Sequence, residues 1–244
     1  NFVLTENNYP VADFELVYTG NTDNAVDVAV LVDADISMAE YQPDVVKAVT
    51  SVMNSVSGRG RLKLVSAGAN PVTEADIREG TTGFLNAASN SKLYVNNGRF
   101  DLGLRLAGSE LILERGRKVI VYITDGRENS TAYEQYHPVE LAGYLKNNGI
   151  RFYPVNVTNE YEMSEELQYI SEQTGGNQLY LYQPEGLSGL MDDVRRKPDG
   201  SYTLIYNSAN TRLTTDDYIP VEVEAFLYNR SGREVSGFYK PYEN

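Results

Sequence analysis

The chain of 244 residues contains 34 Asp and Glu against 21 Lys and Arg, which gives a formal net charge of −13, and it has no cysteine. The acidic excess argues against a nucleic-acid partner and an anionic membrane surface, while the missing cysteine excludes thiol catalysis, thiolate metal sites and disulfides. No apolar run approaches the roughly 20 residues that cross a bilayer, so we expect no membrane span in this chain.

Apolar and polar residues alternate at 11–20, which predicts a strand near the N-terminal end. From residue 25 onward, β-branched apolar runs alternate with amphipathic helical patterns, as is typical of a parallel sheet with helices on both faces. The predicted strands span residues 25–32, 61–68, 117–124, 150–157 and 177–182. The predicted helices span residues 42–58, 100–116, 137–149, 164–176 and 186–197. The polar stretch at 86–99 is expected to be a mobile loop.

Residues 201–244 return to a period of two with no intervening helix. We therefore predict an α/β fold: a doubly wound, mostly parallel sheet with helices on both faces, plus a small antiparallel β annex built from both termini. In this interpretation residues 23–200 form the α/β domain, and residues 1–22 and 201–244 form the two segments of the annex.

The first strand of the α/β domain runs into two carboxylates and a hydroxyl. In VLVDADISM, residues 30–38, the apolar run is followed by Asp33, Asp35 and Ser37. Like charges this close to a buried strand are costly unless a proton or a cation joins them. Two chemistries fit this pattern: a divalent metal held by hard oxygen ligands, or a nucleophilic aspartate with a neighbouring acid/base carboxylate.

A third carboxylate follows another predicted strand. Asp125 comes directly after VIVYIT, within ITDG at residues 123–126. In an open parallel sheet, ligands bind at the carboxyl ends of the strands near the point where the strand order reverses, so we expect Asp125 to approach Asp33 and Asp35. Oxygen ligands without histidine or cysteine suit Mg²⁺, Ca²⁺ or Mn²⁺ better than zinc or copper.

These motifs resemble those of the von Willebrand factor type A domain. DADIS at 33–37 is similar to that family's D-x-S-x-S, and ITDG at 123–126 is similar to its strand that ends in T-D-G. ISEQTGG at 170–176 resembles the family's I-A-x-x-T-G-G, and the tail at 201–244 looks like the strands that follow this domain in many bacterial members. The resemblance covers nearly the whole chain and implies a metal-ion-dependent adhesion site in a divergent form.

The resemblance implies a role for each residue of the motifs. Asp33 would anchor the metal, Ser37 would supply a direct oxygen ligand, and Asp125 would contribute directly or through water. Asp35 stands at a serine position of the family, where its extra charge would tighten cation binding or favour Ca²⁺ over Mg²⁺. The expected metal ligands are therefore Asp33, Asp35, Ser37 and Asp125, with Mg²⁺ or Ca²⁺ as the cofactor.

Two further residues are expected to contact a ligand. The family's threonine, which is linked to high-affinity ligand binding, has its place around residues 96–98, where this chain has no threonine. Asn97 would offer an amide oxygen there, so Asn97 and Arg127 are the predicted ligand-binding residues. Arg127 follows the T-D-G motif and would gate the site or pair with one of its aspartates, taking the place of the cation.

The resemblance implies a non-enzymatic module for protein-protein interaction or adhesion. We expect it to come from an exported bacterial protein located in the periplasm, at the cell surface or outside the cell. Its partner would be another protein, bound through an acidic side chain at the metal, although three aspartates around one divalent ion lower its attraction for such a group. A metal-free structural scaffold is an alternative within the same class.

An enzymatic alternative shares the first motif. An apolar strand followed by D-x-D also resembles the opening of the haloacid dehalogenase superfamily, in which Asp33 would be the nucleophile and Asp35 the general acid/base of a Mg²⁺-dependent phosphotransferase. That superfamily requires an acidic pair at the end of a further strand. In this chain Asp192 and Asp193 lie instead in a predicted amphipathic helix, which weakens the enzymatic interpretation.

Overall fold

The chain divides into two compact units, one formed by residues 21–199 and the other by residues 1–20 together with 200–244. We call them the large unit and the terminal unit. The computed structural model describes residues 1–20, 25–56, 60–90, 93–114, 116–196, 200–209, 218–228 and 230–239. Predictions lie outside the described residues where they fall on 21–24, 57–59, 91–92, 115, 197–199, 210–217, 229 and 240–244.

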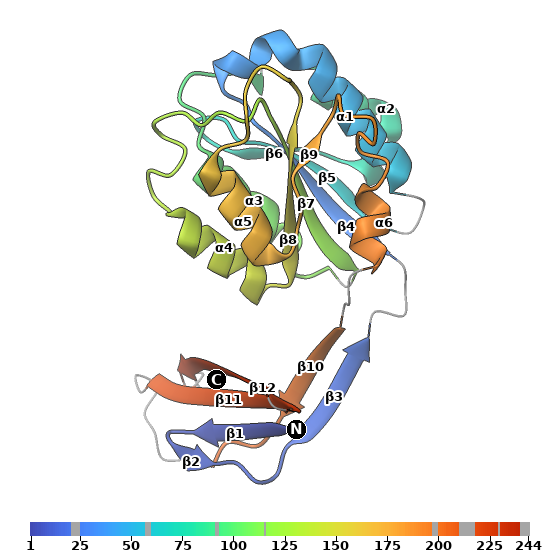
Figure 1. Ribbon diagram of the computed structural model, residues 1–244. Coiled ribbons are helices and arrows are strands. Elements are labelled where there is room, and N and C mark those ends of the chain that lie inside the picture. Colours follow the sequence, from blue (N-terminus) through green and yellow to red (C-terminus); the bar gives the residue numbers. More distant parts are fainter. Residues whose placement is uncertain are drawn as a thin grey trace. The chain divides into compact units, whose positions relative to one another are not determined.

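The large unit is built on a six-stranded sheet with the strand order β6-β5-β4-β7-β8-β9. Neighbouring strands are parallel, except that β5 and β6 are antiparallel. The strands are β4 (Val26–Val32), β5 (Leu62–Ser66), β6 (Val72–Asp76), β7 (Arg117–Thr124), β8 (Ile150–Asn156) and β9 (Leu179–Tyr180). The predicted doubly wound, mostly parallel α/β fold is thereby confirmed (Figure 1).

Helices cover both faces of this sheet, as Figure 1 shows. One face packs against α1 (Gln42–Ser55), α2 (Thr81–Ala88) and α6 (Leu190–Arg196). The other face packs against α3 (Phe100–Ser109), α4 (Pro138–Asn147) and α5 (Glu165–Thr174). A strand covered on both sides carries mostly apolar residues, which explains why six of the seven residues of β4 are apolar and all seven are buried. The exception is Asp27, whose carboxylate accepts from the backbone N–H groups of Arg61 and Gly116.

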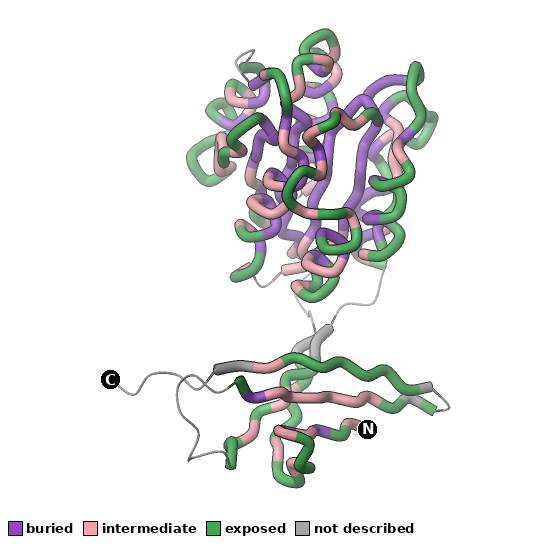
Figure 2. Tube along the Cα trace, turned by 90° about the vertical axis from the view of Figure 1, so that its left-hand side faces the viewer, coloured by how far each residue is buried: buried purple, intermediate pink, exposed green. Residues whose placement is uncertain are grey.

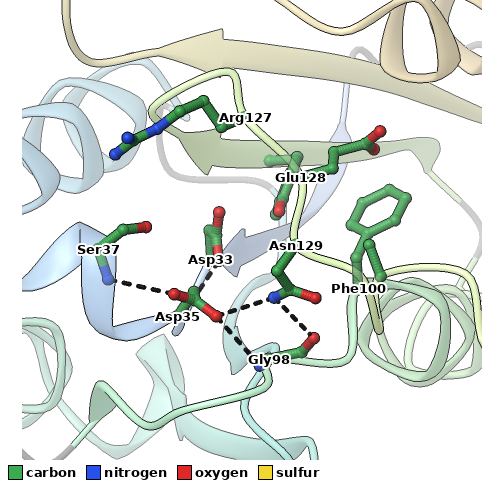
Figure 3. Close-up of a pocket in the computed structure, with 10 residues that line it drawn as sticks. Asp33, Asp35, Ser37, Gly98, Phe100, Arg127, Glu128 and Asn129 are labelled. Atoms are coloured by element: carbon green, nitrogen blue, oxygen red, sulfur yellow. Dashed lines mark hydrogen bonds between the residues drawn. The ribbon is translucent and has the colours of Figure 1, made fainter.

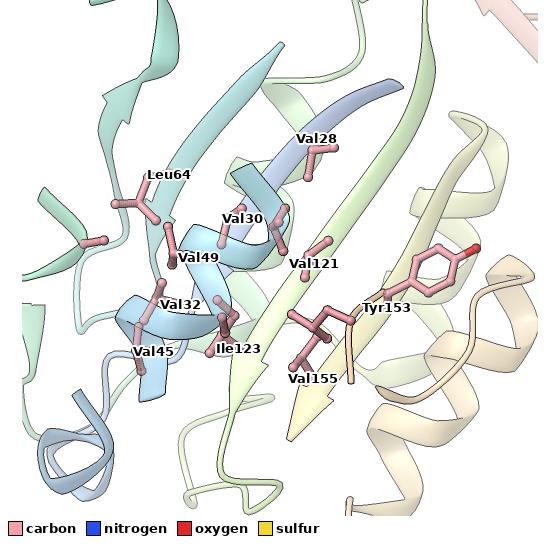
Figure 4. Packing of buried hydrophobic residues seen from close by; sticks show 14 of the residues in the cluster. Val28, Val30, Val32, Val45, Val49, Leu64, Val121, Ile123, Tyr153 and Val155 are labelled. Atoms are coloured by element: carbon pink, nitrogen blue, oxygen red, sulfur yellow. The ribbon is translucent and has the colours of Figure 1, made fainter. Parts of the chain in front are cut away.

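Alternate residues of β4 serve two separate apolar clusters, because successive side chains of a strand point to opposite faces. Val30 and Val32 belong to the cluster that contains Val49 of α1, and Figure 4 shows these side chains packed together. Ala29 and Leu31 belong to the cluster on the other face. The central strand is thus fixed from both sides.

The terminal unit contains only strands among its described residues. A four-stranded antiparallel sheet has the order β12-β11-β1-β2, and β3 and β10 form a separate antiparallel pair. These strands are β1 (Phe2–Glu6), β2 (Tyr9–Pro10), β3 (Glu15–Gly20), β10 (Gly200–Ile205), β11 (Tyr218–Leu227) and β12 (Arg230–Tyr239). Because β1 pairs with β11, both ends of the chain build one sheet, as predicted, and Figure 2 shows it to be far less buried than the sheet of the large unit.

No regular element was predicted between residues 69 and 99, and this prediction was wrong for three segments. β6, the 3₁₀ helix η2 (Ile77–Glu79) and α2 lie there, and residues 86–88 of the predicted loop are helical. β6 has no buried residue and pairs on one side only, so it lacks the apolar run that marks the inner strands. The helix α2 is short, with only Phe84 and Ala88 buried and no side-chain cap at its start.

The strand order reverses between β4 and β7. From β4 the chain passes through α1 to β5, while β7, on the other side of β4, continues through α4 to β8. Because α1 and α4 cover opposite faces, the connections that follow Val32 and Thr124 diverge and leave room for a ligand between them. We call this end of the sheet the carboxyl edge.

The approach of α3 to the sheet gives a stability prediction. A Cβ atom at Gly103 would lie 2.7 Å from the Cβ of Ala67, so Gly103→Ala is expected to lower the free energy of unfolding by about 1–3 kcal/mol through overpacking. This outweighs the gain of up to about 1 kcal/mol in helix propensity. The control is Gly143→Ala in α4, where a Cβ would meet no atom within 4 Å and the same propensity gain should raise stability. Urea unfolding of both variants checks the prediction, and an equal gain for both would contradict it.

Candidate functional site

The loops at the carboxyl edge are tied together by their backbones. The Asp33 N–H donates to the carbonyl of Ile123 at 2.9 Å, which holds the end of β4 against β7. The Val95 N–H donates to the carbonyl of Ala34 at 2.8 Å, and Asp35 and Val95 form a parallel bridge. The segment before α3 is thereby held beside the first motif, although the two lie far apart in the sequence.

Asp33 is a buried carboxylate at the end of β4, with 7% of its surface exposed. One of its oxygens accepts from the Asp35 N–H at 3.0 Å and the other from the Thr124 hydroxyl at 3.0 Å. Burial raises the pKa of Asp33 to about 6, and the nearby charges of Asp125 and Asp35 push it in the same direction, whereas the two hydrogen bonds oppose the rise. The ionised carboxylate is therefore poorly compensated.

Asp35 lies between two loops. Its Oδ1 accepts from the Ser37 N–H at 3.2 Å and so caps the short 3₁₀ helix η1 (Ile36–Tyr41). Its Oδ2 accepts from the side-chain amide of Asn129 at 2.8 Å and from the Gly98 N–H at 3.4 Å (Figure 3). Asp35 therefore joins the first motif to the loops that precede α3 and follow β7.

Ser37 follows in the same turn and is half-buried. Its backbone N–H is held by Asp35, but its hydroxyl has no hydrogen-bond partner within the described part of the chain. The hydroxyl is thus a free oxygen at the carboxyl edge.

Asp125 is fully buried, and its charge is balanced inside its own loop. One oxygen accepts from the Arg127 N–H at 2.9 Å, and the other accepts from Arg127 Nε at 2.9 Å and Nη2 at 2.6 Å. The guanidinium carbon lies 3.9 Å from the centroid of the Tyr161 ring. Arg127 therefore forms an ion pair with Asp125, an aspartate of the T-D-G motif, across their own loop.

A cavity of about 220 Å³ opens at the carboxyl edge. Four of the six predicted site residues line it, namely Asp33, Asp35, Ser37 and Arg127. The other lining residues are Gly98, Phe100, Tyr122, Glu128, Asn129 and Ala132.

Two of the predicted site residues, Asp125 and Asn97, do not line the cavity. Asp125 lies beneath the guanidinium of Arg127, with its side chain 1% exposed. Asn97 is exposed, with a φ of 60° in the left-handed region that asparagine tolerates. At the neighbouring residue, Gly98, the backbone N–H contacts Asp35 instead.

Glu128 and Asn129 line the cavity but are not among the predicted site residues. Glu128 accepts a hydrogen bond from the Tyr133 hydroxyl, and burial raises the pKa of Glu128 to about 7. Asn129 bridges Asp35 and the carbonyl of Gly98, the latter at 3.0 Å. Both residues follow the T-D-G motif directly, so their place at the end of β7 was the available signal.

The donor set fits an oxygen-ligated divalent cation, with a smaller set than predicted. Asp33, Asp35 and the hydroxyl of Ser37 share the cavity, whereas both oxygens of Asp125 are held by Arg127. Over the described ranges, no group of three or more His, Cys, Asp or Glu side chains is arranged to hold a metal ion. Hydroxyl and water oxygens would therefore complete the coordination of Mg²⁺ or Ca²⁺ here.

Comparisons with known proteins agree with this architecture. A family model described as von Willebrand factor type A domain matches residues 27–192. A search of curated proteins finds no significant match. In the part of the chain that the structure describes, no helix is long and apolar enough to cross a membrane.

Three solved structures illustrate the shared fold. An aerotolerance-related membrane protein from Bacteroides fragilis is 15% identical with a TM-score of 0.51, and the match covers 70% of this chain and all of that one. The manganese-loaded TRAP protein of Plasmodium vivax is 13% identical with a TM-score of 0.51, covering 93% and 97%. The SpRpn10 VWA domain is 20% identical with a TM-score of 0.50, covering 71% and 95%.

The burial of Asp33 predicts a pH-dependent stability. The pKa of Asp33 is about 6 in the folded state and near 4 in the unfolded state, so the folded state binds this proton more tightly. The stability that the proton provides is fully present below pH 4 and is lost as the pH rises to 6, which lowers the free energy of unfolding by about 2–3 kcal/mol. Asn cannot ionise, so Asp33→Asn without divalent cation should be more stable than the wild type at pH 7.5, and the difference should vanish near pH 4.

Chemical denaturation in the presence of EDTA measures this difference. Asp192→Asn removes an exposed carboxylate and is the control, for which no such pH dependence is expected. If Asp33→Asn were the less stable protein at both pH values, the buried charge would not carry the cost assigned to it.

Proposed function

Because the chain belongs to the von Willebrand factor type A domain family, which consists of protein-interaction and adhesion modules, we propose that it binds a partner protein through its carboxyl edge. We further propose that a divalent cation, Mg²⁺ or Ca²⁺, binds at Asp33, Asp35 and Ser37. The partner contacts then come from the loops around these residues and around Arg127.

One observation carries the cation proposal: Asp33 is a nearly fully buried carboxylate in the wall of a cavity, and no basic side chain of the described residues pairs with it. An uncompensated buried charge is costly, and a cation relieves that cost. Asp35 lines the same cavity, and the unpaired hydroxyl of Ser37 adds an oxygen of the kind that hard cations prefer.

The residues around the cavity fix the geometry of this site. Thr124 orients Asp33, and the Asn129 amide and the Gly98 N–H orient Asp35. Such outer hydrogen bonds preset a ligand's position and so reduce the cost of ordering it on binding. When bound, a cation neutralises the two carboxylates and offers a coordination position to an oxygen of the partner.

A phosphotransferase of the haloacid dehalogenase type finds less support. Ser66, at the end of β5, would have to supply the hydroxyl of that superfamily's second motif. Its hydroxyl instead donates to Glu74 at 2.6 Å, within the β5–β6 pair. Asp193 lies in α6 and accepts from the Tyr153 hydroxyl at 2.8 Å and from Asn177 at 3.0 Å. Both side chains are held by these hydrogen bonds and neither lines the cavity that contains Asp33, so the non-enzymatic interpretation is the one we propose.

A location outside the cytoplasm, in the periplasm, at the cell surface or secreted, is part of the proposal. Domains of this family are commonly extracellular, and the absence of cysteine suits an oxidising compartment.

Divalent cations are expected to stabilise the protein, because a ligand that binds only the native state raises stability by mass action. At 10 to 100 times the dissociation constant of Ca²⁺ or Mg²⁺ the gain is about 1–3 kcal/mol, which should raise the melting temperature by several degrees. Asp35→Asn and Ser37→Ala should reduce this shift, whereas the exposed-site control Asp192→Asn should retain it. Thermal unfolding with and without each ion is the measurement. No shift at millimolar concentrations of either ion would leave the metal-free scaffold as the surviving alternative.

A further inference from the structure

Arg127 is held in place at the carboxyl edge and still has unused donors. Its Nε and Nη2 bind the buried Asp125, and its guanidinium lies over the ring of Tyr161. Its side chain is nevertheless 41% exposed and lines the cavity. Nη1 has no hydrogen-bond partner among the residues that the structure describes. Figure 3 shows the guanidinium on the Ser37 side of the cavity, extended away from Glu128.

Resting on the proposed function of the carboxyl edge, we propose that Arg127, and not the bound cation, takes the acidic side chain of the partner protein. The partner's carboxylate accepts hydrogen bonds from the free Nη1 edge of the guanidinium, while Nε and Nη2 remain bound to Asp125.

The fixed position of Arg127 favours this role. An arginine normally loses side-chain freedom when it binds, and this loss of entropy weakens the interaction. Here Asp125 and Tyr161 have already ordered the guanidinium, so a partner meets a rigid donor. Arginine and tyrosine, like tryptophan, are also enriched among the residues that dominate binding energy at protein interfaces.

The charges around the cation site also favour Arg127 as the group that binds the partner's carboxylate. The carboxylates of Asp33 and Asp35 balance the two charges of a divalent ion, and Glu128 lines the same cavity. An ion so neutralised attracts a further carboxylate weakly. Arg127 has a single buried counterion on one edge, and its other edge keeps N–H donors that only an acceptor can satisfy.

The neighbouring surface indicates which partner segment fits. Ile36, between Asp35 and Ser37, is 52% exposed, and Tyr161 is 38% exposed. An acidic residue flanked by an apolar one would therefore find both a donor and an apolar contact at this edge.

The chain contains a matched control for Arg127. Arg78 pairs with Asp76 at the same spacing, through its backbone N–H, Nε and Nη2, and its side chain is 59% exposed. Asp76 lies opposite Lys63 in the register of β5 and β6, near the start of β5. The Arg78–Asp76 ion pair is therefore at the end of the sheet opposite to the carboxyl edge. Arg78→Gln removes the same charge and the same kind of ion pair away from the cavity.

The test is a titration of the ¹⁵N-labelled full chain with the peptide acetyl-Gly-Asp-Gly-amide, followed by the backbone amide signals and the Arg127 Nε–H signal. We expect binding at the carboxyl edge with an affinity that changes less than about twofold between EDTA and millimolar CaCl₂. Arg127→Gln should weaken it about tenfold or more in both buffers, a loss typical of an interface arginine, while Arg78→Gln should not. The acetyl-Gly-Asn-Gly-amide peptide should not bind.

Arg127→Lys guards against a folding artefact, because it keeps a positive charge above Asp125 but loses the planar donor edge. It should bind about as weakly as Arg127→Gln. The proposal is overturned if EDTA abolishes peptide binding while Arg127→Gln leaves it intact, if Arg127→Lys binds as tightly as the wild type, or if the peptide fails to bind in both buffers. Cation-induced thermal stabilisation, measured separately, shows whether the protein binds a divalent cation.

Discussion

The hydrogen bond from the Thr124 hydroxyl to Asp33 joins the ends of β4 and β7, and the candidate site depends on it. These strands are parallel neighbours from which the chain leaves in different directions, and the bond adds a buried polar link to the apolar packing of Val32 and Ile123 at their ends. The bond fixes a buried carboxylate at that junction, where burial raises its pKa to about 6. A charge held there destabilises the protein until a cation or a proton joins it, and this cost is what a ligand can relieve.

The two buried aspartates at this edge meet the same problem in different ways. Asp125 is neutralised by Arg127 within its own loop, at the expense of contributing to the cavity. Asp33 has hydrogen bonds but no opposite charge, and it remains a wall of the cavity. In the proposal, Asp33 therefore binds the cation and Arg127 binds the partner protein.

Much of this arrangement follows from local sequence patterns. Apolar runs and helical periodicity predicted the inner strands, and the residues after those strands include Asp33, Asp35, Ser37 and Arg127. The rest depends on long-range contacts that no local pattern encodes. The bonds from Gly98 and Asn129 to Asp35 span 63 and 94 residues of the chain, and they form only because the loops adopt particular conformations. For the same reason β6, an edge strand without a buried residue, could not be distinguished from a loop.

The most direct measurement for the central claim is paramagnetic relaxation enhancement by Mn²⁺, added in small amounts to the ¹⁵N-labelled protein. Mn²⁺ accepts the same oxygen ligands as Mg²⁺ and broadens amide signals near the site at which it binds. A cation at the junction of β4 and β7 predicts that broadening is strongest at residues 33–37, 98 and 125–129, and that excess Ca²⁺ or Mg²⁺ reverses it. Broadening spread over other acidic surfaces of this chain, with these residues unaffected, would contradict the account.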